Sequence, residues 1–104
     1  MIEADIPFTV HVEGRDGEVT IVATGDLDPS TAPSVAAILH QHRGDDVLLD
    51  LTQVGFADIS IVRTLVAERD HAERSGTRFA IAGAGAGVRS AFEALGVAGL
   101  FEWS

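Results

Sequence analysis

The sequence predicts a single α/β domain in which a mainly parallel sheet of four to five strands is flanked by helices and preceded by a hairpin. Short apolar runs with the two-residue period of strands alternate along the chain with segments of helical period. The length of 104 residues is that of one domain, and 46% hydrophobic residues are enough for one core. No linker or internal repeat divides the sequence, so we expect residues 1–104 to form one domain.

The first expected elements are two antiparallel strands. Apolar and polar side chains alternate in residues 8–12 and again in residues 18–23. Residues 14–17 lie between these runs and contain two glycines, which is typical of a turn. We therefore expect a β-hairpin.

A loop and a first helix come next. Residues 25–33, GDLDPSTAP, are dense in Asp, Pro and Ser and predict the loop. The helical spacing that follows is carried by Val35, Ile38, Leu39 and His42. Gly44 ends the run, so the helix has about three turns.

A central strand and a second helix are expected in the middle of the chain. The nearly continuous apolar run at residues 47–51 predicts a strand buried on both faces. Helical spacing returns at Asp58, a suitable N-cap because its carboxylate accepts hydrogen bonds from first-turn amides, and ends at Ser75 and Gly76. The pattern turns Val62, Leu65 and Val66 inward, and Arg63, Glu68, Asp70 and Glu73 outward.

The carboxyl-terminal third predicts one more strand and helix. Residues 78–82 form the strand and residues 83–87, GAGAG, a loop. The helix is marked by Val88, Phe92 and Leu95. Gly96 closes it, and residues 100–104 give short apolar cover. Strands separated by helices imply parallel pairing through right-handed crossovers.

The charge balance excludes several classes of function. Sixteen Asp and Glu against seven Lys and Arg give a formal charge of -9, which repels nucleic acid and anionic membranes and attracts basic proteins. The chain starts without a basic segment and long apolar run, and no stretch reaches the roughly 20 apolar residues that cross a bilayer. We expect a cytoplasmic protein that neither binds nucleic acid nor inserts into a membrane.

Three carboxylates are candidates for chemistry. Asp26, Asp28 and Asp58 follow a strand or begin a helix, where they could hold a cation such as Mg²⁺ or supply an acid and a base. The favoured alternative is that Asp28 and Asp58 accept hydrogen bonds from turn and helix-start amides. The chain has no cysteine, and His40 and His42 point to different helix faces. We therefore assign no catalytic residue, metal ligand or cofactor, and do not expect an enzyme.

Two further segments have a chemical interpretation. The glycines at 83–87 follow a strand and open a helix, but Val88 stands where a dinucleotide-binding sequence needs Gly or Ala, so a flexible turn is favoured over weak anion binding. Ser60 lies in the first turn of the second helix, where amides and the helix dipole stabilise a phosphate, and Arg63 lies one turn further on. Residue chemistry alone favours an ordinary first-turn serine.

In order, these segments resemble the STAS domain of bacterial anti-sigma factor antagonists. GDLDPSTAP is similar to that family's Gly-(acid)-Leu-Asp loop with a Thr-Ala pair, and VLLDLTQVGFAD to its strand, loop, aromatic and Asp. ERSGTRFAIAGAGAGVRSAFEALGVAGLFE is similar to its last strand, loop and helix. The resemblance covers the chain from about Val19 to Glu102.

The resemblance implies a partner-switching regulator. In the family the unphosphorylated domain binds a kinase-type anti-sigma factor and frees a sigma factor, and phosphorylation on the second helix releases it. The implied partner-binding surface comprises Asp26, Asp28, Ser30, Thr31, Asp58, Ile59, Ser60 and Arg63.

This chain departs from the family at the phosphoacceptor. The Ser or Thr that normally follows the Asp is Ile59, which has no oxygen to accept a phosphoryl group, and Ile61 stands where glycine is usual. Three interpretations are compatible with this departure. Ser60 has become the phosphoacceptor, the domain binds its partner without control by phosphorylation, or the domain is a scaffold or accessory subunit of another complex. Ile59 is either an apolar interface anchor or part of the core.

The expected function is a protein-interaction regulator that binds an anti-sigma factor or a similar kinase-type partner without the usual serine switch. The alternatives are a STAS accessory subunit of a transporter or lipid-transport complex, and a small-ligand or nucleotide-binding domain. An enzyme that uses the three carboxylates ranks after these. A homodimer is compatible with the sequence.

Overall fold

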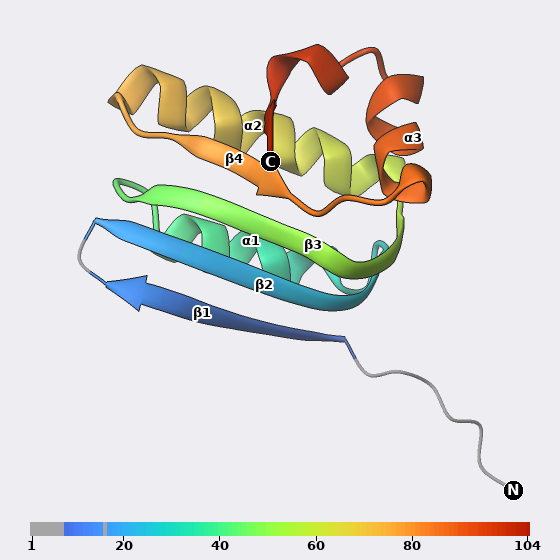
Figure 1. Ribbon diagram of the computed structural model, residues 1–104, viewed down its shortest axis with the longest axis horizontal. Helices are drawn as coiled ribbons and strands as arrows, with labels where there is room; N and C mark the ends of the chain where they lie inside the picture. Colours follow the sequence, from blue (N-terminus) through green and yellow to red (C-terminus); the bar gives the residue numbers. More distant parts are fainter. Residues whose placement is uncertain (1–7, 16) are drawn as a thin grey trace, which may run out of the picture.

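The computed structural model of the chain describes residues 8–15 and 17–104. Its elements are β1 (Thr9–Arg15), β2 (Glu18–Leu27), α1 (Ala32–Gln41), β3 (Asp46–Ala57), α2 (Ile59–Ser75), β4 (Phe79–Ala82), α3 (Ala86–Ala94), the 3-10 turn η1 (Ala98–Leu100) and β5 (Glu102–Trp103). The strands form one sheet in the order β1-β2-β3-β4-β5, in which β1 is antiparallel to β2 and the other pairs are parallel (Figure 1). The predicted α/β class and the hairpin are confirmed.

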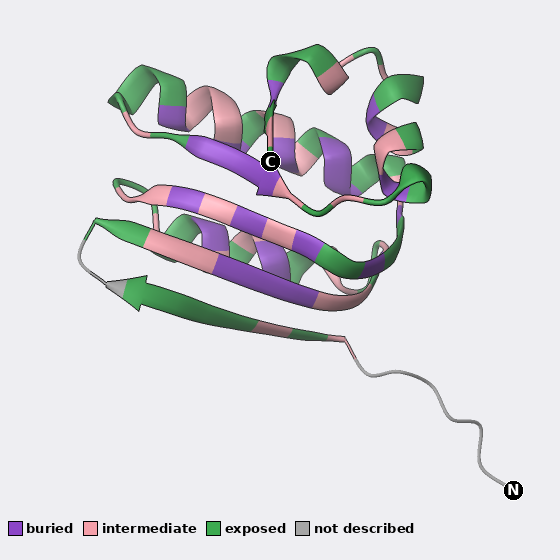
Figure 2. Cartoon of the chain, in the orientation of Figure 1, coloured by how far each residue is buried: buried purple, intermediate pink, exposed green. Residues whose placement is uncertain are grey.

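The core lies between one face of the sheet and the three helices. Ile21, Leu49 and Ile81 are register partners on β2, β3 and β4 and are fully buried (Figure 2). They share one cluster with Val35 of α1 and Phe92 of α3. The parallel strands β2 to β5 follow one another across the sheet in one direction, and each crossover between them is right-handed. All the helices therefore lie on the same face of the sheet, which explains the single core.

The opposite face of the sheet is not covered by a helix in the described part of the chain. Thr20, Leu48 and Ala80 form a register row on this face, and Leu48 is only half-buried. The prediction of a central strand buried on both faces is therefore wrong. Burial alternates over residues 46–51 of β3, as in a sheet with one covered face.

Two strands are longer than predicted. β2 continues to Leu27, so residues 25–27 of the expected loop are strand, and β3 continues to Ala57 instead of ending at residue 51. Their parallel pairing persists through Gly25 opposite Val54 and Leu27 opposite Ala57, with two register irregularities. The paired backbone groups outweigh the poor strand propensity of glycine. The site described below is built on this extension.

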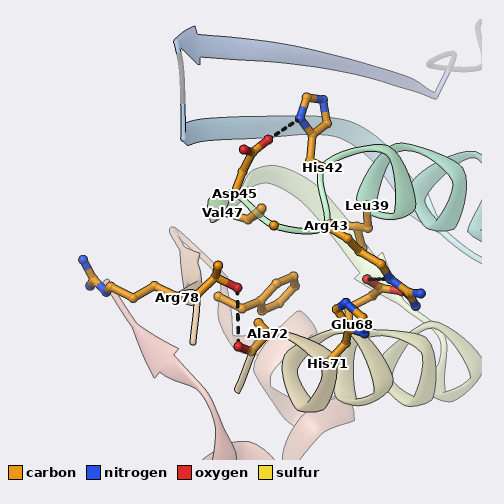
Figure 3. A pocket seen from close by; sticks show the side chains of 12 residues that line it. Leu39, His42, Arg43, Asp45, Val47, Glu68, His71, Ala72 and Arg78 are labelled. Atoms are coloured by element: carbon orange, nitrogen blue, oxygen red, sulfur yellow. Dashed lines mark hydrogen bonds and ion pairs between the residues drawn. The ribbon is translucent and has the colours of Figure 1, made fainter. Parts of the chain in front are cut away.

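The second helix is confirmed, with one correction to its outward face. Its N-cap is Asp58, and Gly76 ends it in a left-handed conformation with φ of 77°. Glu68 was expected to face outward but is 5% exposed. Arg43, just after α1, reaches it with two hydrogen bonds, from Nη2 to Oε2 at 2.8 Å and from Nε to Oε1 at 3.2 Å (Figure 3). The paired guanidinium allows the carboxylate to be buried.

The ends of the other helices differ from the sequence pattern by one or two residues. His42 follows α1 as its C-cap instead of continuing it, and Leu95 follows α3 in the same way. The carboxyl-terminal tail does more than cover the core, because β5 pairs Trp103 with Ile81 of β4. No helix in residues 8–15 and 17–104 is long and apolar enough to span a membrane.

Candidate functional site

The candidate site lies where β2 and β3 end. The loop at residues 28–31 follows β2, and α2 begins directly after β3. The Asp58 amide donates a hydrogen bond to the Leu27 carbonyl at 2.7 Å, which holds the two segments together. Carboxyl ends of neighbouring parallel strands meet at one sheet edge, where loops carry functional side chains. Two of the predicted segments are therefore adjacent.

Asp28 organises the loop. Its Oδ1 accepts hydrogen bonds from the Ser30 amide at 2.9 Å, the Ser30 hydroxyl at 2.6 Å and the Thr31 amide at 3.1 Å. Thr31 Oγ1 donates to the Asp26 carbonyl at 2.8 Å, which closes the turn ahead of α1. These bonds, the Ser30 hydroxyl above all, lower the pKa of Asp28, so the loop carries a fixed negative charge.

Asp58 caps α2 as predicted. Its Oδ2 accepts a hydrogen bond from the Ser60 amide at 2.9 Å. This bond lowers the pKa of Asp58, whereas the negative charge of Asp28 acts in the opposite direction. The two carboxylates are thus close enough to interact, and together they form a negative rim at the amino end of α2.

Two of the three candidate carboxylates bind local backbone amides. Asp28 Oδ1 and Asp58 Oδ2 accept these hydrogen bonds. Asp26, at the exposed end of β2, lies toward Gly55, where a Cβ would be 3.6 Å from its Oδ1. The described residues contain no group of three or more His, Cys, Asp or Glu side chains that could hold a metal ion. The favoured alternative, in which Asp28 and Asp58 satisfy local amides, is confirmed.

Ile59 and Phe56 are exposed large apolar residues at the junction of β3 and α2. Ile59 is 41% exposed, so it does not fold back into the core, and Phe56 is 51% exposed on the strand just before α2. We call these two residues the apolar pair. Sequence reasoning missed Phe56, which lies next to the buried Ala57 in β3 and is exposed.

Ser60 and Arg63 are both exposed on the first turns of α2, where a partner protein or a kinase can reach them. Ser30 is exposed beside Asp28, and Thr31 is half-buried. Ile61, at the position where the family usually has glycine, is fully buried in the core. The replacement of that glycine therefore adds to the core and leaves the exposed surface unchanged.

The glycine-rich loop at residues 83–85 follows β4 and closes tightly against β3. Gly83 has φ of 71°, and a Cβ there would lie 1.9 Å from Thr52 Oγ1. Gly87, in the first turn of α3, would place a Cβ 3.4 Å from the Gly55 carbonyl oxygen. Close packing therefore accounts for glycine at position 83, whereas a Cβ at position 87 would make an ordinary contact.

Comparison with known proteins identifies the family. The model of the family described as "Mlab, STAS domain" matches residues 10–102. No curated protein sequence matches the chain. Three similar solved structures show the fold.

An anti-sigma factor antagonist from Mycobacterium paratuberculosis has a TM-score of 0.81 at 23% identity, with 93% of this chain and 85% of that chain covered. An anti-sigma factor antagonist described as putative, from Thermotoga maritima, has a TM-score of 0.78 at 15% identity, covering 90% and 84%. The phosphorylated form of the Bacillus cell fate determinant SpoIIAA has a TM-score of 0.71 at 16% identity, covering 94% and 91%. The match of sequence and fold over nearly the whole length means that this chain belongs to the STAS domain family.

Proposed function

We propose that this protein is a non-enzymatic regulator that binds an anti-sigma factor or a similar kinase-type protein through the amino end of α2. The observation that carries the proposal is the apolar pair, Phe56 and Ile59, exposed at 51% and 41% beside the acidic rim. Solved proteins of the same fold are described as anti-sigma factor antagonists, which supports a partner of this kind. The partner-binding surface comprises Asp26, Asp28, Ser30, Thr31, Phe56, Asp58, Ile59, Ser60 and Arg63.

The surface has the composition of a binding centre. A partner that covers Phe56 and Ile59 gains the free energy of removing apolar area from water, and such central anchors carry most of the energy of an interface. Asp28 and Asp58 are ionised beside the pair at neutral pH, and their lowered pKa values extend this charge further into the acidic range. The complementary partner surface therefore has an apolar pocket with Lys or Arg at its edge.

The first prediction tests this surface directly. Ile59→Asp should weaken partner binding by about thirtyfold or more, because it places a charge in the apolar centre and adds to the negative rim. The helix should persist, since an acid in the first turn is favoured by the helix dipole. The measurement is affinity capture from cells of the source organism, followed by calorimetry or interferometry with the identified partner.

The matched control is Leu100→Asp. Leu100 is 42% exposed, close to the 41% of Ile59, but it lies in η1, outside the loops of the site. Leu100→Asp is expected to bind within about twofold of the unmodified protein, as surface changes outside an interface do. Equal affinity of both variants, or recovery of no regulatory partner, contradicts the proposed function.

The second prediction concerns phosphorylation. When the captured kinase-type partner is incubated with ATP and this protein, we expect no phosphate at position 59, and any phosphate on Ser60. Ser60→Ala should then abolish labelling, whereas Thr64→Ala, one turn further on, should leave it unchanged. Ile59→Ser restores a hydroxyl at the usual position of the family and is expected to be labelled there. Stoichiometric labelling of Ser60→Ala contradicts this assignment.

A second candidate function is an accessory subunit of a transporter or lipid-transport complex. The observation that favours it is that the matching family model is described as Mlab and not as an anti-sigma factor antagonist. An unphosphorylatable Ile59 also suits a permanent subunit. The same capture experiment separates the two functions, since a transporter component in place of a kinase-type regulator supports the second.

A further inference from the structure

The strand β1 leaves one long edge of the sheet unpaired in the described structure. It is the first strand of the sheet order, and its outer edge faces away from β2 (Figure 1). The other edge strand, β5, has two residues, whereas β1 has seven. An exposed strand edge offers a row of backbone donors and acceptors to another strand.

This edge lacks two of the features that prevent strand addition, proline and a bulge, although Glu13 and Arg15 are charged. Residues 9–15 contain no proline and no lysine, and β1 keeps an unbroken register with β2 at all seven positions, without a bulge. Val12 is 38% exposed in the middle of the strand. β1 is therefore an edge of unbroken register with a partly uncovered apolar centre, and its backbone departs from ordinary strand geometry only at Gly14, which has φ of 124°.

We infer that β1 is the interface of a homodimer, in which two copies pair antiparallel to form one ten-stranded sheet with Val12 on the two-fold axis. A two-fold axis perpendicular to a sheet places one residue opposite its own copy. With Val12 at this position, Thr9 lies opposite Arg15 of the second copy, so all seven residues of β1 are paired.

The charges select the same register. His11 and Glu13 lie on the same face of β1, with His11 Nε2 2.7 Å from Glu13 Oε2. An axis at Val12 puts His11 of each copy opposite Glu13 of the other, so imidazoles and carboxylates alternate over four positions. An axis at Glu13 instead places the two Glu13 carboxylates opposite each other, and an axis at His11 places the two imidazoles opposite each other. Like groups directly opposite each other destabilise a sheet, so these two registers are less favourable.

The dimer leaves the candidate partner site accessible. The paired edge is the outer side of β1, whereas the apolar pair and the acidic rim lie at the ends of β2 and β3. The inference therefore does not depend on the proposed function. Each dimer would present two partner-binding surfaces, which increases avidity for a dimeric partner.

Single cysteines test the register, because the chain contains no cysteine of its own. Directly opposite residues have Cα atoms about 4.5–5.5 Å apart, which is within disulfide range. Val12→Cys should therefore form a covalent dimer under mild oxidation at micromolar concentration. Val10→Cys lies about 14 Å from its own copy along paired strands and should react at least tenfold more slowly. Leu100→Cys reports random collisions, since Leu100 is as exposed as Val12.

Exchange of the charges tests the dimer without a cross-link. In sedimentation equilibrium the unmodified chain should show twice its mass of 10.9 kDa. His11→Glu places carboxylates opposite each other at two symmetric positions and should raise the dissociation constant about tenfold. Addition of Glu13→Lys restores opposite charges and should recover the dimer. A monomer at every concentration up to about 1 mM, or cross-linking of Val10→Cys as fast as of Val12→Cys, overturns the inference.

Discussion

Replacement of Phe92 by alanine is expected to lower the free energy of unfolding by about 3–5 kcal/mol. Phe92 is fully buried in α3, with its ring centroid 5.1 Å from that of Phe101 and 5.1 Å from that of Trp103, both edge to face. Its removal loses the transfer energy of the ring, leaves a cavity and breaks two aromatic contacts. Because Trp103 is the single tryptophan of the chain, its fluorescence follows this region during chemical unfolding.

Phe56→Ala provides the matched control for this prediction. The substitution is chemically identical, but Phe56 is 51% exposed, so its loss should change the free energy of unfolding by less than about 1 kcal/mol. The same variant should weaken partner binding, whereas Phe92→Ala should affect binding only through stability. Equal destabilisation by the two variants would mean that the aromatic cluster does not hold α3 and β5 to the core.

The sequence allowed the class of fold and most elements to be predicted because periodicity and capping are local. The apolar spacing, the Asp58 cap and the Gly76 stop define α2 correctly. β5 was not predicted, because two residues are too few to show the alternation of apolar and polar side chains that marks a strand. It forms because Trp103 packs on Phe92 and its backbone pairs with β4.

Other differences arise from contacts distant in sequence. Glu68 was expected to face solvent, but Arg43, 25 residues earlier, donates hydrogen bonds to its buried carboxylate, and His40 Nδ1 lies 3.5 Å from Oε2. The extension of β3 to Ala57 depends on the pairing with β2 and is absent from the local apolar pattern. Local reasoning works where a residue's neighbours in space are also its neighbours in sequence.

In the candidate site, too, the local contacts could be predicted from the sequence and the contacts between distant segments could not. Asp28 and Asp58 cap a turn and a helix, and these local roles were predicted. Their proximity depends on the hydrogen bond from the Asp58 amide to Leu27, which follows from the sheet topology. The exposure of Ile59 could not be decided from sequence, because both a core and a surface position suited an apolar first-turn residue.

Three glycines allow the packing of the β4–α3 loop to be tested quantitatively. Gly83 has a left-handed φ of 71° and no room for a Cβ. Gly76 also has a left-handed φ, 77°, but a Cβ there would meet no atom. Gly85 has an ordinary φ of -77° and likewise has room for a Cβ. Gly85 is the N-cap of α3, where alanine is less favourable than glycine, so alanine at this position should cost less than about 1 kcal/mol. Alanine at Gly76 should cost about 1 kcal/mol, the penalty of a left-handed conformation.

Gly83→Ala is expected to cost about 2–4 kcal/mol, because steric overlap adds to the left-handed conformation. The added Cβ would lie 1.9 Å from Thr52 Oγ1, which is held by a 2.6 Å hydrogen bond to Asp50, and 3.1 Å from Thr52 Cα. Thr52→Ala removes the hydroxyl but not the backbone, so the double variant should recover only part of the loss, with a coupling of about 1 kcal/mol. Chemical unfolding of the unmodified protein and of the five variants measures these differences. If Gly83→Ala were as harmless as Gly85→Ala, the loop would be loose, and the sequence interpretation as a flexible turn would be correct.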